Sequence, residues 1–158
     1  MRMIRVFSLC VIMLLVPGLA WSTVPDTVDT TEIEIQQCLL SIQKAAENLD
    51  VDSVFSFVLE NDNGALIENG RLLLTREDAI ENTRGGFRGV KHINYKFDQE
   101  HITLLSDDLA LVVSDGLSHV ELEDGRVFKT AFAQSVLLKR VEGEWKVLHA
   151  HRSIPNRL

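Results

Sequence analysis

Apolar residues recur at three- and four-residue steps between residues 31 and 49, which is the spacing of an amphipathic α-helix. The polar positions between them carry mainly Gln, Lys and Glu, so one helix face is suited to solvent. Thr31 and Glu34 match a capping box at the start of this helix. The apolar face that must be buried comprises Ile35, Cys38, Leu39, Ile42, Ala46 and Leu49.

A short second helix and a third helix follow, separated by turn residues. The second is predicted around residues 54–58, where apolar side chains are dense. Ala65–Ile67 and Arg71–Leu74 are predicted to be two brief strands joined by a tight turn at Asn69-Gly70. Thr75 is suited to cap the third helix, which we expect to stop at Gly85-Gly86.

From Val90 onward the apolar period changes to two, which is typical of β-strands. Turn signals at residues 106–108, 124–125 and 142–143 divide this half into four long strands. Asp115-Gly116 predicts a bulge or bend inside the second of them. Helices followed by a strand meander indicate an α+β fold. We expect a cone-shaped, curved antiparallel sheet whose concave face holds the three helices of the N-terminal half, with room for a small ligand.

The first 22 residues have the pattern of an export signal. Arg2 and Arg5 precede an apolar run over Val6–Val16, which is short for a membrane span, and small residues flank Trp21 before a cut after Ser22. We therefore expect an exported protein, periplasmic or secreted, that leaves the membrane after cleavage. An uncleaved membrane anchor is the alternative.

The remaining sequence is long enough for one domain over residues 31–158, after a flexible lead-in at 23–30. Cleavage would remove two of 16 basic residues and none of the 23 acidic ones, giving a net charge of 14 − 23 = −9. This balance, without a basic cluster, argues against nucleic acid as a partner. Cys38 would be the single remaining cysteine, so no internal disulfide is expected, and its place on the helix stripe predicts a buried, inert thiol.

Three segments resemble the nuclear transport factor 2-like superfamily, in its SnoaL-like and ketosteroid-isomerase-like branch. They are residues 47–55, 74–80 and 143–153. The last segment, GEWKVLHAHRS, also resembles the end of the calcium/calmodulin-dependent kinase II association domain. The resemblance implies a cystatin-like cone that hosts isomerases, dehydratases, cyclases and hydrolases as well as binding and assembly domains. It also implies that Arg152 faces the pocket, although a second arginine expected on the preceding strand falls at Val136.

Arg152 is the candidate anchor of a ligand-binding pocket, because a guanidinium group can hold a carboxylate through two hydrogen bonds. A structural ion pair is the alternative. Leu148 and Ala150 share its strand phase, while Trp145 and Val147 occupy the opposite phase, and both phases are apolar enough to face the core. Further candidate ligand contacts are Tyr95, His119, Gln134 and Leu148, with either Gln134 or Ser135 projecting inward.

Candidate catalytic residues are few and do not form a complete set. His119, Tyr95 and Glu121 are candidates for acid–base catalysis, together with His92. The resemblance implies inward acidic residues on the late strands of an isomerase, but those positions carry Val112, Val113, Ala131 and Ala133. His149 and His151 could bind a metal with His119 or Glu121. A strand pair of this kind is more often packed or hydrogen-bonded, so we expect no metal and no cofactor.

Three functional hypotheses follow. The first is a non-enzymatic domain that binds a small, mostly apolar molecule whose acidic group, such as a carboxylate, is held at Arg152. The second is an enzyme of the isomerase or lyase type that works through His119, Tyr95 or the paired histidines. The third is an assembly module whose sheet face, with Trp145 and the His149/His151 phase, pairs with itself. We expect a homodimer through the sheet face.

Overall fold

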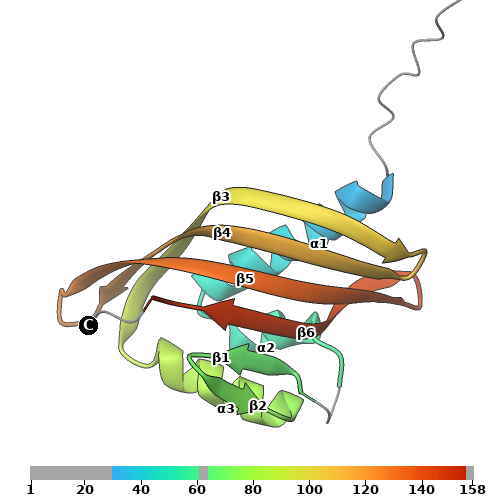
Figure 1. Cartoon of the computed structure of the whole chain (residues 1–158). Helices are drawn as coiled ribbons and strands as arrows, with labels where there is room; N and C mark the ends of the chain where they lie inside the picture. Colours follow the sequence, from blue (N-terminus) through green and yellow to red (C-terminus); the bar gives the residue numbers. More distant parts are fainter. Residues whose placement is uncertain (1–29, 61–63, 156–158) are drawn as a thin grey trace, which may run out of the picture.

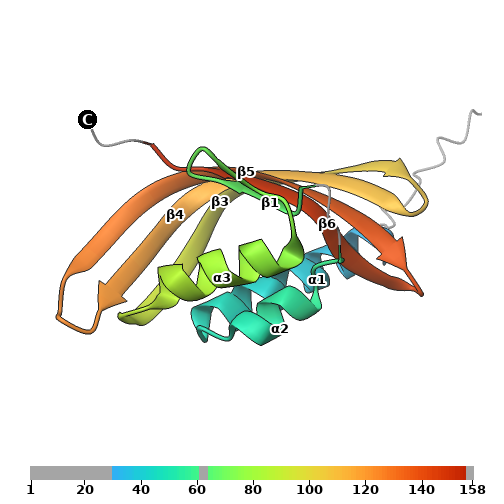
Figure 2. The ribbon, with the colours of Figure 1, turned by 90° about the horizontal axis from the view of Figure 1, so that it is seen from below.

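The computed structural model describes residues 30–60 and 64–155. The predicted signal peptide and residues 23–29 of the lead-in lie outside these ranges. Three helices, α1 (Thr30–Glu47), α2 (Val51–Ser56) and α3 (Arg76–Phe87), lie beneath the concave side of an arched sheet (Figure 2). None of the helices in the described ranges is long and apolar enough to cross a membrane.

Six strands form one sheet in the order β2-β1-β6-β5-β4-β3 (Figure 1). The predicted α+β fold with a curved sheet is confirmed, with one difference: β1 pairs with β6 in parallel, so the sheet is mixed. All other neighbouring strands are antiparallel. The strands are β1 (Leu66–Glu68), β2 (Arg71–Leu73), β3 (Val90–Ser106), β4 (Leu109–Leu122), β5 (Val127–Val141) and β6 (Glu144–Ser153).

The third helix differs from its prediction at its end. Thr75 caps the helix as expected, in a capping box with Asp78. The helix nevertheless continues through Gly85-Gly86 to Phe87, and the chain turns at Gly89, whose φ is +73°. Glycine weakens a helix interior by only about 1 kcal/mol, which packing against the rest of the domain readily offsets.

The bend expected at Asp115-Gly116 involves the neighbouring strand. β4 is continuous, and the register of β3 shifts between Phe97 and Gln99 where it faces these two residues. A Cβ atom on Gly116 would lie 2.2 Å from the carbonyl oxygen of Lys96. The absence of a side chain therefore lets β3 approach β4 closely at the place where the sheet curves.

Two apolar clusters hold the helices to the sheet. α1 buries Ile35 and Cys38 against strand residues that include Val112, Leu138 and Trp145. A second cluster joins α2, α3 and the β1–β2 hairpin, with Phe55 and Ala79 among its members. The two clusters leave a part of the concave face between α1 and α3 that neither helix fills, and the cavity described below occupies this space.

A bulge at Leu148 decides which side chains of β6 face inward. Leu138 pairs with Val147 and Leu137 pairs with His149, so the register shifts at this point and β6 has one extra residue, Leu148. One extra residue shifts the alternation, because successive side chains of a strand point to opposite faces. Before the bulge Trp145 and Val147 are 4% and 6% exposed in the core. The prediction that Trp145 belongs to a self-pairing outer face is therefore wrong.

After the bulge the inward positions are Ala150 and Arg152. Ala150 packs against the core cluster, and both residues line the cavity. Both alternating sets of residues in β6 thus face inward, Trp145 and Val147 before Leu148 and Ala150 and Arg152 after it. This arrangement places the expected anchor, Arg152, on the concave face.

Candidate functional site

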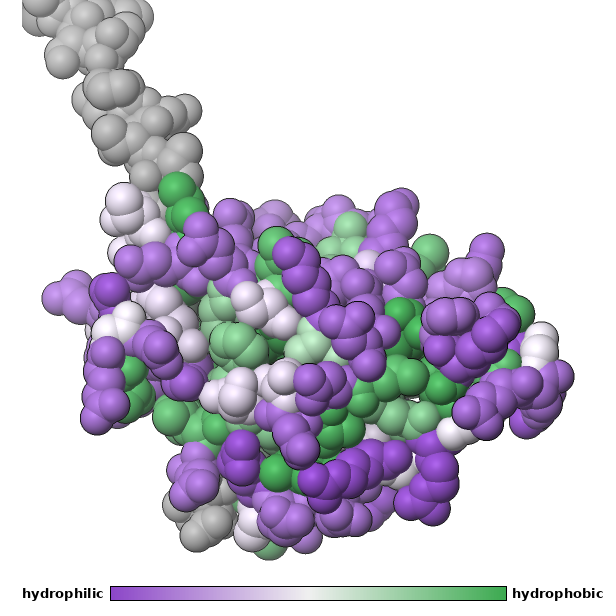
Figure 3. All heavy atoms as spheres, turned by 180° about the vertical axis from the view of Figure 1, so that it is seen from behind, coloured by the Kyte–Doolittle hydropathy of each residue, from purple (hydrophilic) through white to green (hydrophobic). Residues whose placement is uncertain are grey.

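A cavity of about 1620 Å³ lies between α1, α3 and the concave face of the sheet. Seen from the helix side, apolar residues gather around the hollow and polar residues surround them (Figure 3). The apolar wall includes Leu39 and Ile42 of α1 and Tyr95, Phe97 and Phe132 of the sheet. The cavity is larger than the roughly 300–1,000 Å³ of a typical ligand pocket, and its apolar wall with a few polar groups is suited to a small organic molecule.

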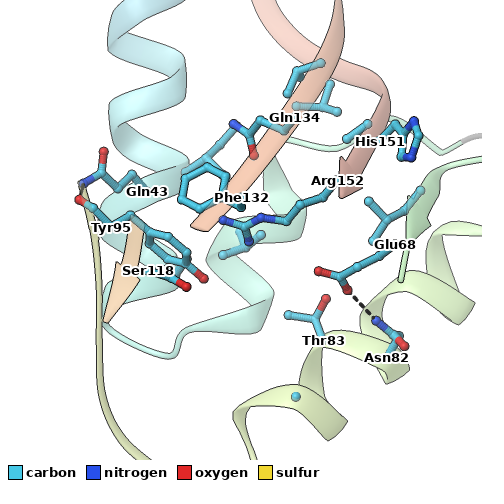
Figure 4. A pocket seen from close by; sticks show the side chains of 18 of the residues that line it. Gln43, Glu68, Asn82, Thr83, Tyr95, Ser118, Phe132, Gln134, His151 and Arg152 are labelled. Carbon is cyan, nitrogen blue, oxygen red and sulfur yellow. Dashed lines mark hydrogen bonds between the residues drawn. The ribbon is translucent and has the colours of Figure 1, made fainter. Parts of the chain in front are cut away.

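Arg152 extends from β6 into this cavity, over aromatic rings (Figure 4). Its guanidinium carbon lies 4.2 Å from the ring centre of Phe132 and 4.9 Å from that of Tyr95. Tyr95 and Phe97 in turn contact Phe132 edge to face, with ring centres 6.0 and 5.4 Å apart. Cation–π attraction and this aromatic packing hold the guanidinium in place.

No acidic residue in the described ranges forms an ion pair with Arg152. Its Nε is buried and has no hydrogen-bond partner there. The alternative interpretation, a structural ion pair, therefore finds no support in the described part of the chain. A buried donor without an acceptor is unfavourable, so a ligand that supplies an acceptor would relieve this loss.

The backbone that carries Tyr95 is fastened to α1 by Glu47. Glu47 Oε1 accepts hydrogen bonds from the Tyr95 amide at 3.0 Å and from Asn94 Nδ2 at 3.1 Å. Gln43 Nε2 donates to the same carboxylate at 3.0 Å and to the Tyr95 carbonyl at 3.1 Å. These contacts keep the aromatic wall at a defined distance from the helix. Nothing in the sequence marks Glu47 or Gln43 as part of the site, because only the packing of α1 against β3 brings them there.

At the α3 side of the cavity, acidic and amide groups are already satisfied. Asn82 Nδ2 donates to Glu68 Oε2 at 3.0 Å (Figure 4), and Arg71 Nη1 donates to Asn82 Oδ1 at 3.3 Å. Glu68, Arg71 and Asn82 all line the cavity. Their mutual hydrogen bonds leave Arg152 as the cationic lining residue without a hydrogen-bonded partner among the described residues.

His119 and Glu121, two candidate catalytic residues, do not line the cavity. On β4 the inward positions are Ser118 and Val120, which places His119 and Glu121 on the convex side. Lys91 Nζ binds Glu121 Oε1 at 2.7 Å, and this hydrogen bond lowers the pKa of the Glu121 carboxyl. His92 faces Glu121 across the strand pair. Tyr95 is the single member of the candidate catalytic set that lines the cavity.

The paired histidines differ in position, because His151 lines the cavity beside Arg152 whereas His149 does not line it. His149 Nδ1 lies 2.7 Å from the carbonyl oxygen of Gly64, and His151 is exposed at the rim. In residues 30–60 and 64–155, no three side chains of the metal-binding types are grouped to hold an ion. Gln134 lines the cavity as predicted for one of the pair Gln134/Ser135, whereas Leu148, at the bulge, is not a lining residue.

The arrangement is one guanidinium held on aromatic rings, that of Arg152, in a large, mostly apolar space whose other cation, Arg71, is hydrogen-bonded to Asn82. Such a site can hold an amphipathic molecule whose acidic group meets the guanidinium edge and whose apolar body packs between the aromatic wall and α1. Burial of that body would contribute about 25 cal/mol per Å².

Solved structures show the same fold at low sequence identity. A candidate dehydratase of the NTF2-like family from Streptomyces avermitilis matches with a TM-score of 0.72 and 16% identity, over 81% of this chain and 98% of that one. A ketosteroid isomerase-like protein from Erwinia carotovora atroseptica matches with a TM-score of 0.65 and 20% identity, over 78% and 95%. A candidate calcium/calmodulin-dependent protein kinase II association domain from Xanthomonas campestris matches with a TM-score of 0.69 and 14% identity, over 79% and 88%.

These likenesses establish the architecture, and the cystatin-like cone expected from the sequence is confirmed. No curated protein matches the chain. The model of the SnoaL-like domain family matches residues 35–157, which is most of the chain. The chain therefore belongs to the SnoaL-like domain family.

Proposed function

We propose that this protein is an exported, non-enzymatic binding domain for a small, mostly apolar molecule that carries one acidic group. The observation that supports it best is Arg152, a guanidinium stacked on Phe132 and Tyr95 inside the cavity without an acidic partner in the described ranges. The stacking leaves the guanidinium edge available to hydrogen-bond acceptors. A planar carboxylate fits that edge with two parallel hydrogen bonds.

Binding is favoured over catalysis by the positions of the candidate acid–base groups. His119 and Glu121 are on the convex side, away from the cavity. Tyr95 faces the cavity but lies against the guanidinium of Arg152, which supports a wall role. An isomerase or lyase is the alternative, and its base would have to be one of the other titratable residues that line the cavity, such as Glu100 or His151.

The proposal is tested by calorimetry with a pair of probes that differ mainly in charge, naphthoate and naphthamide. We expect the protein to bind naphthoate more tightly, because hydrogen bonds between charged groups contribute roughly 1.5–3 kcal/mol, or about 10- to 100-fold in affinity. Arg152→Gln should remove this preference. Arg126→Gln is the matched control, since Arg126 also lies over a ring, that of Phe128 at 5.9 Å, but on an exposed hairpin.

Equal affinity for the acid and the amide would contradict the proposal, as would a preference that survives Arg152→Gln. A circular dichroism melt of each variant shows whether the fold is intact. Loss of naphthoate binding counts for the proposal only when the Arg152→Gln melt resembles that of the wild type.

Export is a separate part of the proposal and is supported by the basic, apolar and small-residue pattern of residues 1–22. We propose that the chain is cut after Ser22 and acts in the periplasm or outside the cell. Fractionation of expressing cells with mass spectrometry of the mature N-terminus tests this. A chain that keeps its first residues in the cytoplasmic fraction would contradict it.

A further inference from the structure

A row of polar side chains crosses the concave face next to the candidate anchor. In the strand register Glu100 faces Ser114, Ser114 faces Gln134, and Gln134 faces Arg152. Residues directly opposite each other in a sheet point to the same face. Four neighbouring strands, β3 to β6, thus place four polar side chains side by side in an otherwise apolar layer.

The positions on either side of this row are apolar or lack a side chain. On one side the register aligns Ile102, Val112, Val136 and Ala150. On the other side it aligns Phe97, Gly116 and Phe132. A polar row in such surroundings weakens the core unless its groups find partners.

The polar groups of the row are not satisfied within the described residues. Ser114 is 7% exposed and lies between Glu100 and Gln134 without itself lining the cavity, and its Oγ has no hydrogen-bond partner there. Arg152 Nε is buried and unpartnered in the same way. Gln134 and Glu100 line the cavity; Glu100 is the exposed end of the row, and partial burial raises the pKa of its carboxyl above its ordinary value. The row therefore offers donors and acceptors that the domain itself leaves unused.

We propose that Ser114, Gln134 and Glu100 form a second subsite that binds a hydroxyl group on the molecule whose acid Arg152 holds. This inference rests on the proposed function and names its ligand class: a hydroxylated acid with an apolar ring body. A hydroxyl suits the row because it donates to the Glu100 carboxylate or the Gln134 carbonyl and accepts from Ser114 Oγ or the Gln134 amide. An amphipathic molecule without a hydroxyl would leave Ser114 unsatisfied.

The spacing of the sheet agrees with one molecule reaching both subsites. The guanidinium lies over Phe132, two residues before Gln134 on β5. Two residues along a strand span about 6.6 Å, and neighbouring strands are about 4.8 Å apart. The acid and the hydroxyl would therefore be separated by roughly the length of one or two fused rings.

The test compares naphthoate with hydroxynaphthoate isomers that carry the hydroxyl on the ring remote from the acid. Calorimetry on the wild type should show that at least one isomer binds roughly three- to tenfold more tightly than naphthoate, the range expected for one hydrogen bond to a buried neutral group. Ser114→Ala should abolish this gain and leave naphthoate affinity unchanged. The matched control is Ser135→Ala, because Ser135 is an exposed neighbour of Gln134 on the other phase of β5.

The outcomes separate this inference from the proposed function. Naphthoate binding through Arg152 without a gain for any isomer overturns the hydroxyl subsite and leaves the acid site standing. The hydroxyl subsite is also overturned if a hydroxynaphthoate isomer still binds more tightly than naphthoate in both Ser114→Ala and Gln134→Met. If the wild type binds none of the acids, the proposed function fails and the hydroxyl subsite fails with it. A gain lost in Ser114→Ala and kept in Ser135→Ala supports the subsite.

Discussion

Cys38 is an example, at the scale of one residue, of burial deciding the chemistry of a side chain. Its thiol is buried between α1 and β6 and donates to the Trp145 carbonyl oxygen at 3.2 Å. Burial raises the pKa of the Cys38 thiol to about 11, because the thiolate would be poorly solvated. The reactive thiolate is therefore scarce at neutral pH, as the position of Cys38 on the helix stripe had predicted.

We predict that Cys38 of the folded protein resists iodoacetamide at pH 8, whereas the same residue in urea is alkylated readily. In the unfolded chain the pKa of the Cys38 thiol returns to its ordinary value and the reagent reaches the thiol freely. Unfolding therefore removes both causes of protection, the raised pKa and the burial. Mass spectrometry of the peptide that contains Cys38, sampled over time, provides the measurement. Similar alkylation rates with and without urea would show that the thiol is not protected.

At the scale of the secondary-structure element, residue type predicted caps and turns but misplaced the end of α3 at Gly85-Gly86, and it could not predict a register shift. The capped start at Thr75 and the turn at Glu142-Gly143 followed from local chemistry. The inward side of β6 could not be chosen, because the bulge at Leu148 lets both apolar phases face the core in succession. Arg152 and Gln134 were identified as candidate pocket residues, whereas Ser114 and Glu100 become visible only once three strand pairs are in register.

Two glycines, Gly116 at the bend of the sheet and Gly85 inside α3, should respond in opposite ways to substitution by alanine. We predict that Gly116→Ala destabilises the fold by roughly 1–3 kcal/mol, because the new Cβ would collide with the Lys96 carbonyl and force the strands apart. Gly85→Ala, the matched substitution inside α3, meets no atom within 4 Å and should stabilise the fold by about 0.5–1 kcal/mol. Urea unfolding followed by circular dichroism measures both, and opposite signs are the expected result. Equal effects would contradict the close approach of β3 and β4.

At the scale of the whole molecule, the two faces of the sheet have different surroundings. The concave face is covered by the helices and the cavity, whereas no described helix covers the convex face, which is turned toward the viewer in Figure 1. Val113 and Leu117 are 38% and 43% exposed there, on either side of Asp115, and the exposed Ala131 and Ala133 face Leu117 and Asp115 in the register. Neighbouring exposed apolar residues on a sheet are typical of a surface that meets a partner.

We propose that two copies associate through this convex patch of Val113, Leu117, Ala131 and Ala133, because closed symmetric pairs bring the same patch of both copies together. Leu117→Glu should then split the dimer, since each substitution would place a charge in the buried contact and, near the axis, two like charges against each other. Leu40→Glu is the control, because Leu40 is a similarly exposed leucine, at 47%, on α1 at the cavity side. Sedimentation velocity at micromolar concentration should give a dimer for the wild type and Leu40→Glu and a monomer for Leu117→Glu. A monomeric wild type would rule out the association, and a dimer that survives both Leu117→Glu and Val113→Glu would place the contact on another surface.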